Sequence, residues 1–399
     1  MKRAVTSEEL EQPLVPYRDA LDAIVGSFAP LDALDLPLGE ALGLVAAENV
    51  IAPIDVPAFE NSAMDGYAVR AQDTPGTLTV VDDVPAGTSP SLAVAPGTAV
   101  TIMTGAPLPA GADAVAPWED TERRGDLVEV LRAFASGKHV RPRGEDVAAG
   151  TAVIVSGTEL RAVEIGVLAS IGRSSVRVSP RPRVAILSTG DEVAEPGAPL
   201  PPAGIYDANR ALLRAMCEQS GARVVAEALI GDDPAAIAGW LGGAAENADV
   251  IVTSGGASVG EHDWMRTIVE RDGSLDLWRV AIKPGKPIIF GRFGRARVFG
   301  LPGNPGSAFV CTHVFVQPAL RKLAGRDPAP RVVRATLAEA VRGSPSRTMF
   351  ARVRLDGERA VPLPAQSSVV LSNIMAAHGF AVVPPGGAQA GSTVDVELL

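Results

Sequence analysis

Three short loops of this 399-residue chain combine residue types that bind anions. Thr253–Gly260 follows an apolar run and precedes a helical pattern, so its glycines would let backbone N–H groups approach an oxyanion. Lys283–Pro287 fixes two lysines in one turn, and a bound anion would offset their repulsion. Pro302–Ser307 ends a third strand-like run and opens a helix. Taken singly, the glycine loop fits an ordinary strand-to-helix turn better than an anion site, by about two to one. The lysine turn taken singly fits a hydrated basic surface equally well.

Several carboxylates stand in turns rather than in regular apolar patterns. These candidates are Asp65, Asp146, Glu192, Asp232 and Asp263. Carboxylate oxygens bind Mg²⁺, which can bridge to phosphate oxygens. Asp232 has an alternative reading, because Asp232-Asp233-Pro234 is also typical of a helix start. Together with the anion-binding loops, the carboxylates indicate chemistry on a phosphate or another oxyanion.

Other reactive residue types give no consistent pattern. The four histidines are scattered, and no spacing predicts a zinc site or a nucleophile elbow. Cys217 and Cys311 are far apart in the sequence, which argues against a disulfide scaffold. We expect Cys311 and His313 to be core residues of an apolar helix rather than ligands.

Composition and charge exclude some classes of protein. The net charge of −10 argues against nucleic-acid binding, although a local basic pocket could still hold a small anion. Pro, Gly and polar residues interrupt every long uncharged stretch, so no membrane span is expected. The N-terminal residues lack the apolar run of a signal peptide, and we predict a cytoplasmic protein.

The elements that must position the loops alternate between strand and helix. The pattern predicts a helix over Ala208–Gln219, a strand over Arg223–Ile230, a strand over Asp249–Thr253 and a long helix over Pro305–Leu323. This alternation from about residue 181 onward predicts a parallel α/β domain.

The flanking regions have other patterns. Tyr17–Val25 and Leu38–Ala47 look helical, while short Val, Thr and Leu runs predict a β-rich module. We predict a discontinuous N-terminal domain (1–53 and 141–180) around a β-rich inserted domain (54–140). An α/β domain (181–326) and a small C-terminal β-domain (327–399) would follow.

Eight segments in order resemble the molybdopterin molybdenumtransferase family, which includes the C-terminal domain of gephyrin. The matching residues are Asn61–Ala68, Ile102–Pro107, Arg143–Asp146, Ser188–Glu192, Ile205–Asn209, Ser254–Gly260 and the loops around Lys283 and Asn304. The resemblance extends from about residue 15 to 375. It implies a multidomain α/β plus β fold, with a central three-layer α/β molybdopterin-binding domain, β-rich flanking modules and a C-terminal β-barrel.

The resemblance also implies an activity and a set of site residues. Such enzymes act as homodimers, take adenylylated molybdopterin and molybdate, release AMP with Mg²⁺ assistance, and yield molybdenum cofactor. The implied catalytic residues are Asp65, Thr104, Asp146, Glu192, Asp232 and Asp263, of which Asp65, Glu192, Asp232 and Asp263 would bind the metal. The implied substrate- and anion-binding residues are Gly255, Gly256, Ser258, Lys283, Lys286, Asn304, Ser307, Arg352 and Ser368.

Two other readings compete with this one. Molybdopterin adenylyltransferase shares the α/β domain, but it carries Gly-Gly-Thr-Gly where this chain has Gly255–Ser258, and it lacks the β-rich modules. A gephyrin-like scaffold that retains the fold is the alternative from another class, although all six catalytic positions carry apt residues here. The candidate protein partners are molybdopterin adenylyltransferase and, if the chain is a scaffold, a protein that it clusters.

Overall fold

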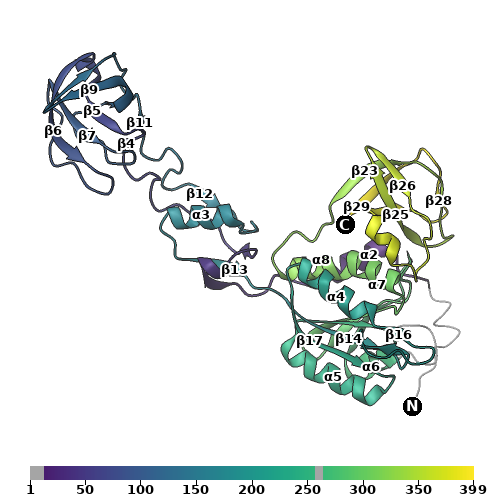
Figure 1. Cartoon of the computed structure of the whole chain (residues 1–399). Helices are drawn as coiled ribbons and strands as arrows, with labels where there is room; N and C mark the ends of the chain where they lie inside the picture. The colour runs from purple at the N-terminus through teal and green to yellow at the C-terminus, as the bar shows by residue number, and fades with distance from the viewer. Residues whose placement is uncertain (1–12, 257–263) are drawn as a thin grey trace. The chain divides into compact units, whose positions relative to one another are not determined.

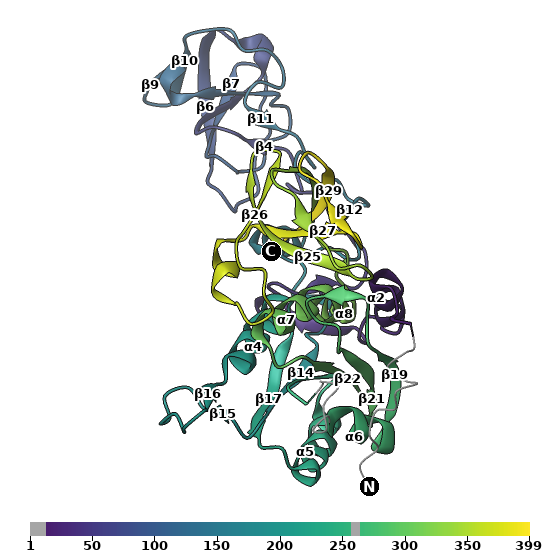
Figure 2. The same cartoon turned by 90° about the vertical axis from the view of Figure 1, so that its right-hand side faces the viewer.

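The computed structural model describes residues 13–256 and 264–399, which form two compact units. The first unit contains residues 13–35, 43–47 and 177–399, and the second contains residues 36–42 and 48–176. Each unit is shown in Figures 1 and 2. No helix of the described residues is long and apolar enough to cross a bilayer.

A six-stranded sheet lies at the centre of the α/β part of the first unit (Figure 1). Its order is β17 (Arg223–Ile230), β14 (Arg183–Thr189), β18 (Val250–Ser254), β22 (Ala296–Leu301), β21 (Ile289–Phe293) and β19 (Ser274–Trp278). The first four strands are parallel, but β21 runs antiparallel to both of its neighbours. The predicted parallel α/β domain thus has four parallel strands. The direction changes at the hairpin of β21 and β22, which a two-residue turn at Gly294-Arg295 closes.

Helices cover both faces of this sheet, which confirms the three-layer α/β architecture. One face is covered by α2 (Tyr17–Gly26), α4 (Ala208–Gln219), α7 (Pro305–Cys311) and α8 (Gln317–Leu323), with a π-helical turn at Thr312–Val316 between the last two. The other face is covered by α5 (Pro234–Asn247) and α6 (Trp264–Asp272).

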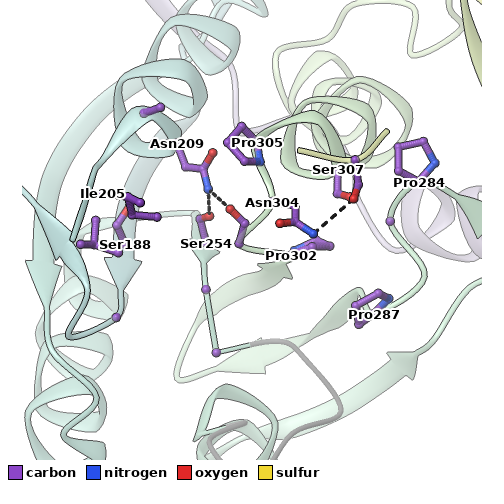
Figure 3. A pocket seen from close by; sticks show the side chains of 18 of the residues that line it. Ser188, Ile205, Asn209, Ser254, Pro284, Pro287, Pro302, Asn304, Pro305 and Ser307 are labelled. Atoms are coloured by element: carbon purple, nitrogen blue, oxygen red, sulfur yellow. Dashed lines mark hydrogen bonds between the residues drawn. The ribbon is translucent and has the colours of Figure 1, made fainter. Parts of the chain in front are cut away.

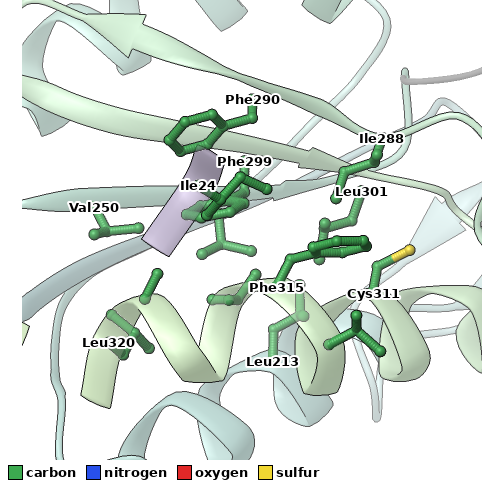
Figure 4. Packing of buried hydrophobic residues seen from close by; sticks show 14 of the residues in the cluster. Ile24, Leu213, Val250, Ile288, Phe290, Phe299, Leu301, Cys311, Phe315 and Leu320 are labelled. Carbon is green, nitrogen blue, oxygen red and sulfur yellow. The ribbon is translucent and has the colours of Figure 1, made fainter. Parts of the chain in front are cut away.

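Strand alternation explains the two cores. In β14, Val184 and Ile186 belong to the core beneath α2, α4, α7 and α8, whereas Ala185 and Leu187 belong to the core beneath α5 and α6. All four side chains are completely buried, as expected for a strand with helices on both faces. Figure 4 shows the first core, where the sheet meets Ile24 of α2 and Leu320 of α8. Cys311 is a buried core residue, as expected. Cys217 is also buried, both cysteines are unpaired, and burial raises the pKa of each thiol to about 12.

The C-terminal residues form a closed five-stranded barrel, which confirms the predicted β-barrel (Figure 2). Its strands pair in the ring β25 (Thr348–Asp356), β26 (Arg359–Pro362), β23 (Val332–Leu337), β29 (Thr393–Leu398), β27 (Gly379–Val383) and back to β25. A short strand before the lysine turn, β20 (Ile282–Lys283), pairs with β25. Phe350 and Phe380 of the barrel join the first core, where Tyr17 meets Phe350 edge to face at 5.4 Å. The barrel is thus packed on the α/β layers.

The second unit is built mainly of strands. Its six-stranded sheet has the order β8 (Ala114–Pro117), β5 (Gly66–Val69), β7 (Thr98–Ile102), β6 (Gly76–Val84), β10 (Leu127–Val130) and β9 (Thr121–Arg124). Further elements are α3 (Ala162–Ser170) and the strand pairs β4 (Asn61–Ser62) with β11 (Val140–Arg141) and β3 (Val50–Ile51) with β12 (Ala152–Ile154).

The helix expected over Leu38–Ala47 is not formed. A single 3-10 turn covers Leu38–Glu40, and Gly43 then adopts a φ of +73°. The following residues form β2 (Val45–Ala46), which pairs with β13 (Ser175–Ser179). Pairing with this distant strand overrides the local helical pattern.

Candidate functional site

A cavity of about 1060 Å³ opens in the first unit, where loops from the α/β sheet meet the barrel (Figure 3). Its walls are the loops that follow β14, β18 and β22, the lysine turn, and barrel residues between 347 and 368. This is the position where open α/β sheets bind ligands, beyond the carboxyl ends of parallel strands. Nine of the predicted site residues line it: Glu192, Asp232, Gly255, Gly256, Lys283, Lys286, Asn304, Ser307 and Ser368.

The other predicted residues are not among the described residues that line the cavity. Ser258 and Asp263 fall outside the described residues. Asp65, Thr104 and Asp146 belong to the second unit.

Glycines at the end of β18 allow the chain to pass close to the end of β14. Gly255 and Gly256 adopt φ values of +93° and +63°. A Cβ atom on Gly255 would lie 2.4 Å from the Thr189 carbonyl oxygen, so no other residue fits there without displacement. The glycines predicted as anion-binding residues therefore also have a steric role.

The cavity has a basic wall. Lys283 and Lys286 both line it, and no described carboxylate forms a salt bridge with either. Burial lowers the pKa of Lys286, and the positive charges of Arg279 and Arg347 lower it further. Arg347 also lines the cavity. An anion placed here would gain from the concentrated positive charge and would stabilise the protonated lysine.

Glu192 and Asp232 place carboxylates in the lining of the same cavity. The N–H of Asp232 donates to Asp191 Oδ1 at 3.0 Å, whereas Asp233 caps α5 by accepting from the N–H of Ala235. Asp233 thus accounts for the helix-start signal in the sequence. The described residues contain no group of three His, Cys, Asp or Glu side chains that could hold a metal alone. Two carboxylates do suit a cation that takes its other oxygen ligands from a phosphate or water.

The barrel contributes directly to the cavity. Asn304 Nδ2 donates to Ser368 Oγ at 3.3 Å, which links the loop after β22 to a barrel loop. Arg352 is only 1% exposed, and its guanidinium donates to the carbonyls of Ala365 and Ser367 at 3.1–3.2 Å. Burial lowers the pKa of Arg352. Arg352 does not line the cavity but holds the barrel loop that does, so anion binding by its side chain stays a prediction.

Two cavity residues, Asn209 and Thr189, lie in segments that carry the resemblance but were not predicted as site residues. Asn209 Nδ2 donates to Ser254 Oγ and to the Gly303 carbonyl, both at 2.7 Å, and so ties two cavity loops together (Figure 3). Thr189 has a buried hydroxyl with no hydrogen-bond partner among the described residues. Its position at the carboxyl end of β14 was the available signal, because polar residues there face the ligand position.

In the second unit, Asp65 and Thr104 meet as a pair. Asp65 Oδ1 accepts hydrogen bonds from the Thr104 N–H at 2.7 Å and the Thr104 hydroxyl at 2.8 Å. These two bonds, the first the stronger cause, lower the pKa of Asp65, so its side chain is a carboxylate at neutral pH. Asp146 is exposed on another turn, where its N–H donates to the Val56 carbonyl at 2.9 Å.

Family models match three stretches of the chain. Residues 15–172 match the MoeA N-terminal region (domain I and II), residues 185–322 a probable molybdopterin binding domain, and residues 334–399 the MoeA C-terminal region (domain IV). Two crystal structures of a molybdopterin biosynthesis MoeA protein from Pyrococcus horikoshii are similar to this chain over nearly its whole length. Their TM-scores are 0.84 and 0.79, their identities 33% and 31%, and the matches cover 96% and 97% of this chain and 99% and 100% of those chains.

Curated relatives agree with the family models. Molybdopterin molybdenumtransferase 2 of Mycobacterium tuberculosis is 41% identical over 337 residues, covering 81% of this chain and 83% of the relative. Molybdopterin molybdenumtransferase of Haemophilus influenzae is 36% identical over 374 residues, covering 91% and 93%. These names favour a transferase over a scaffold. The chain therefore belongs to the molybdopterin molybdenumtransferase family.

Proposed function

We propose that this protein inserts molybdenum from molybdate into adenylylated molybdopterin and releases AMP. The observation that carries the proposal is the cavity of the first unit, which combines a glycine loop, two lysines and two carboxylates. Both substrates are anions, so their approach to each other requires cationic and N–H groups. The names of the curated relatives support molybdopterin and a molybdenum source as substrates, and the adenylylated form of the pterin follows from the resemblance.

The lysines would hold the anions. Lys283 and Lys286 lie on one short turn, and Arg347 adds a third positive charge to the same wall. The Thr189 hydroxyl and the loop around Gly255 offer additional hydrogen-bond donors at the carboxyl ends of β14 and β18. In this arrangement the positive charges and hydrogen-bond donors would offset the repulsion between an oxyanion and a phosphate that are bound together.

Mg²⁺ would bind on the acidic side of the cavity. Glu192 and Asp232 are the cavity residues that would hold it, with phosphate oxygens and water as further ligands. Asp65 and Asp263 are proposed as metal ligands on the resemblance alone. When bound, the ion would neutralise charge on the phosphoanhydride. The protein's own carboxylates would orient the water or oxyanion whose oxygen attacks phosphorus as the bond to the bridging oxygen breaks and AMP leaves.

Asp65 would act in the same reaction as a carboxylate. Its lowered pKa means that it accepts hydrogen bonds at neutral pH and does not donate a proton. Thr104 fixes Oδ1 through two hydrogen bonds and leaves Oδ2 available to the reactants. Asp146 and Asp263 are proposed as catalytic on the resemblance alone.

The experiment that tests the function is AMP release by the purified protein. Adenylylated molybdopterin, molybdate and Mg²⁺ are incubated with the protein, and AMP is quantified by chromatography against a reaction without molybdate. We expect AMP release that requires the protein and is lost in Glu192→Gln. Absence of AMP from a folded preparation would contradict the proposal. The homodimer and the cytoplasmic location expected from the sequence remain predictions.

A further inference from the structure

Trp118 is unlike the other tryptophans of this chain. The chain has four, and Trp240, Trp264 and Trp278 pack against the core beneath α5 and α6. Trp118 lies in the second unit and is 46% exposed, in a protein with only 4% aromatic residues. Trp118 belongs to none of the hydrophobic core clusters of the described residues, and a large, half-exposed aromatic side chain outside the core is suited to contact another group.

Backbone pairing places Trp118 beside the Asp65–Thr104 pair. Gly66 of β5 is paired with Pro117 of β8, and the next N–H along, that of Trp118, donates to the Asp65 carbonyl at 3.3 Å. Strand β5 lies between β7 and β8 in the sheet. Thr104, Asp65 and Trp118 therefore stand at one end of three adjacent strands, and all three are exposed.

Gly66 makes this approach possible. A Cβ atom at this position would lie 2.1 Å from the Ala116 carbonyl oxygen and 2.8 Å from Pro117 Cα. Residues directly across an antiparallel pair have their Cβ atoms about 5 Å apart and on one face of the sheet. The glycine thus permits the close backbone pairing that brings Trp118 next to Asp65, whose carboxylate is proposed to act in catalysis.

We propose that Trp118 is a stacking platform for a flat heteroaromatic ring of the substrate and so contributes to substrate specificity. This inference rests on the function proposed above, because adenylylated molybdopterin carries two such rings, adenine and the pterin. Stacking on an aromatic face does not require positive charge, which suits a site whose neighbouring groups are a carboxylate and a hydroxyl. A ring held by Trp118 would fix the distance between the substrate and Asp65 Oδ2.

The test compares Trp118→Ala and Trp118→Phe with Leu127→Ala as a matched control. Leu127 is equally exposed, at 47%, but lies on β10 near the other edge of the same sheet. We expect Trp118→Ala to raise the KM for adenylylated molybdopterin about 5- to 150-fold, the range found when a base loses its aromatic partner. Trp118→Phe should recover most of the loss, and Leu127→Ala should match wild type. All variants should keep the wild-type Tm.

Fluorescence identifies the ring and separates this proposal from the function. AMP alone should quench the emission that Trp118 contributes, measured as wild type minus Trp118→Phe, if adenine is the stacked ring. Quenching by molybdopterin but not by AMP would identify the pterin instead. Unchanged KM in Trp118→Ala and identical quenching in wild type and Trp118→Phe would overturn the platform. A wild-type protein that releases no AMP but shows the Trp118-dependent quenching would overturn the proposed function and leave the platform standing.

Discussion

Asp65 Oδ1 accepts two hydrogen bonds from Thr104, while Oδ2 accepts none from the described residues. A substitution of Asp65 therefore tests its proposed catalytic role directly. Asp65→Asn removes the negative charge but keeps an oxygen that can accept from Thr104. We predict that AMP release falls at least about 100-fold, the lower end for loss of a positioned acid–base or charged group. The Tm should be unchanged because the side chain is exposed. Wild-type turnover at an unchanged Tm would remove Asp65 from the mechanism.

Thr104 offers a test by pH. Hydrogen bonds to the charged form lower the pKa of Asp65, so Asp65 stays ionised until the pH falls below its ordinary value of 3.8. Thr104→Val removes the hydroxyl bond, and the acid limb of the AMP-release profile should move to higher pH. Thr104→Ser retains the hydroxyl and is the matched control. Coincident acid limbs in all three proteins would show that Asp65 does not govern this limb.

The positive charge of Lys286, in the basic wall of the cavity, is expected to contribute to anion binding. Lys286→Ala is predicted to weaken binding of molybdate or substrate by about 1–3 kcal/mol, the scale of a lost charge-assisted hydrogen bond. Lys322→Ala, on α8 and outside the cavity lining, is the control and should bind like wild type. Isothermal titration measures the dissociation constant of each variant. Superimposable isotherms for Lys286→Ala and wild type would mean that the turn is only hydrated.

Residue types predicted much of the cavity but not how its members are held. The loops with Gly255, Lys283 and Asn304 were recognisable because glycine, lysine and proline mark anion-binding turns, and all three line one cavity. Asn209 lies in the matching segment Ile205–Asn209 but was not predicted as a site residue, and Trp118 belongs to no recognised motif. Their positions depend on pairing between strands and loops that are distant in the sequence.

At the scale of elements, Gly306 allows the start of α7 to pack closely against the barrel loop. A Cβ atom on Gly306 would lie 2.5 Å from the Arg352 guanidinium, 2.7 Å from the Ser368 carbonyl and 3.0 Å from the Val370 carbonyl. Gly306→Ala is therefore predicted to cost about 1–3 kcal/mol of stability, the range for an overpacked core. Because the displaced loop lines the cavity, molybdate binding should weaken as well.

Gly239 is the matched control for this substitution. It lies inside α5, where an added Cβ atom would meet open space, so Gly239→Ala should stabilise the protein by about 0.5–1 kcal/mol. Chemical denaturation measures both changes. A Gly306→Ala protein as stable as wild type would show that the loop can move without cost.

Local patterns predicted the elements whose neighbours agree with them. The helix over Ala208–Gln219 and the strand over Arg223–Ile230 are present with the predicted bounds, because apolar periodicity and the N-cap of Asp207 act within the segment. The helix predicted over Leu38–Ala47 was wrong, and the antiparallel strand β21 was not predicted. In both places the outcome depends on pairing with a partner strand, which periodicity does not encode.

For the whole molecule, the resemblance predicts a homodimer in which both copies contribute to each reaction. Inactive Asp65→Asn and inactive Glu192→Gln proteins, mixed and allowed to exchange subunits, should then regain activity. Random exchange puts half of the dimers in the mixed form with one of two sites restored, so about a quarter of wild-type turnover is expected. Native mass spectrometry confirms the exchange. No recovery despite complete exchange, or a monomer at micromolar concentration, would contradict the prediction.

The central claim is that molybdenum insertion and AMP release are one reaction of this protein. The most direct measurement is the amount of molybdenum bound to the pterin product per AMP released, from elemental analysis and chromatography of the same single-turnover reaction. We predict one molybdenum atom per AMP, with both lost together in Lys286→Ala at limiting molybdate. AMP release without molybdenum in the product would mean that the protein only hydrolyses the adenylylated pterin and would contradict the claim.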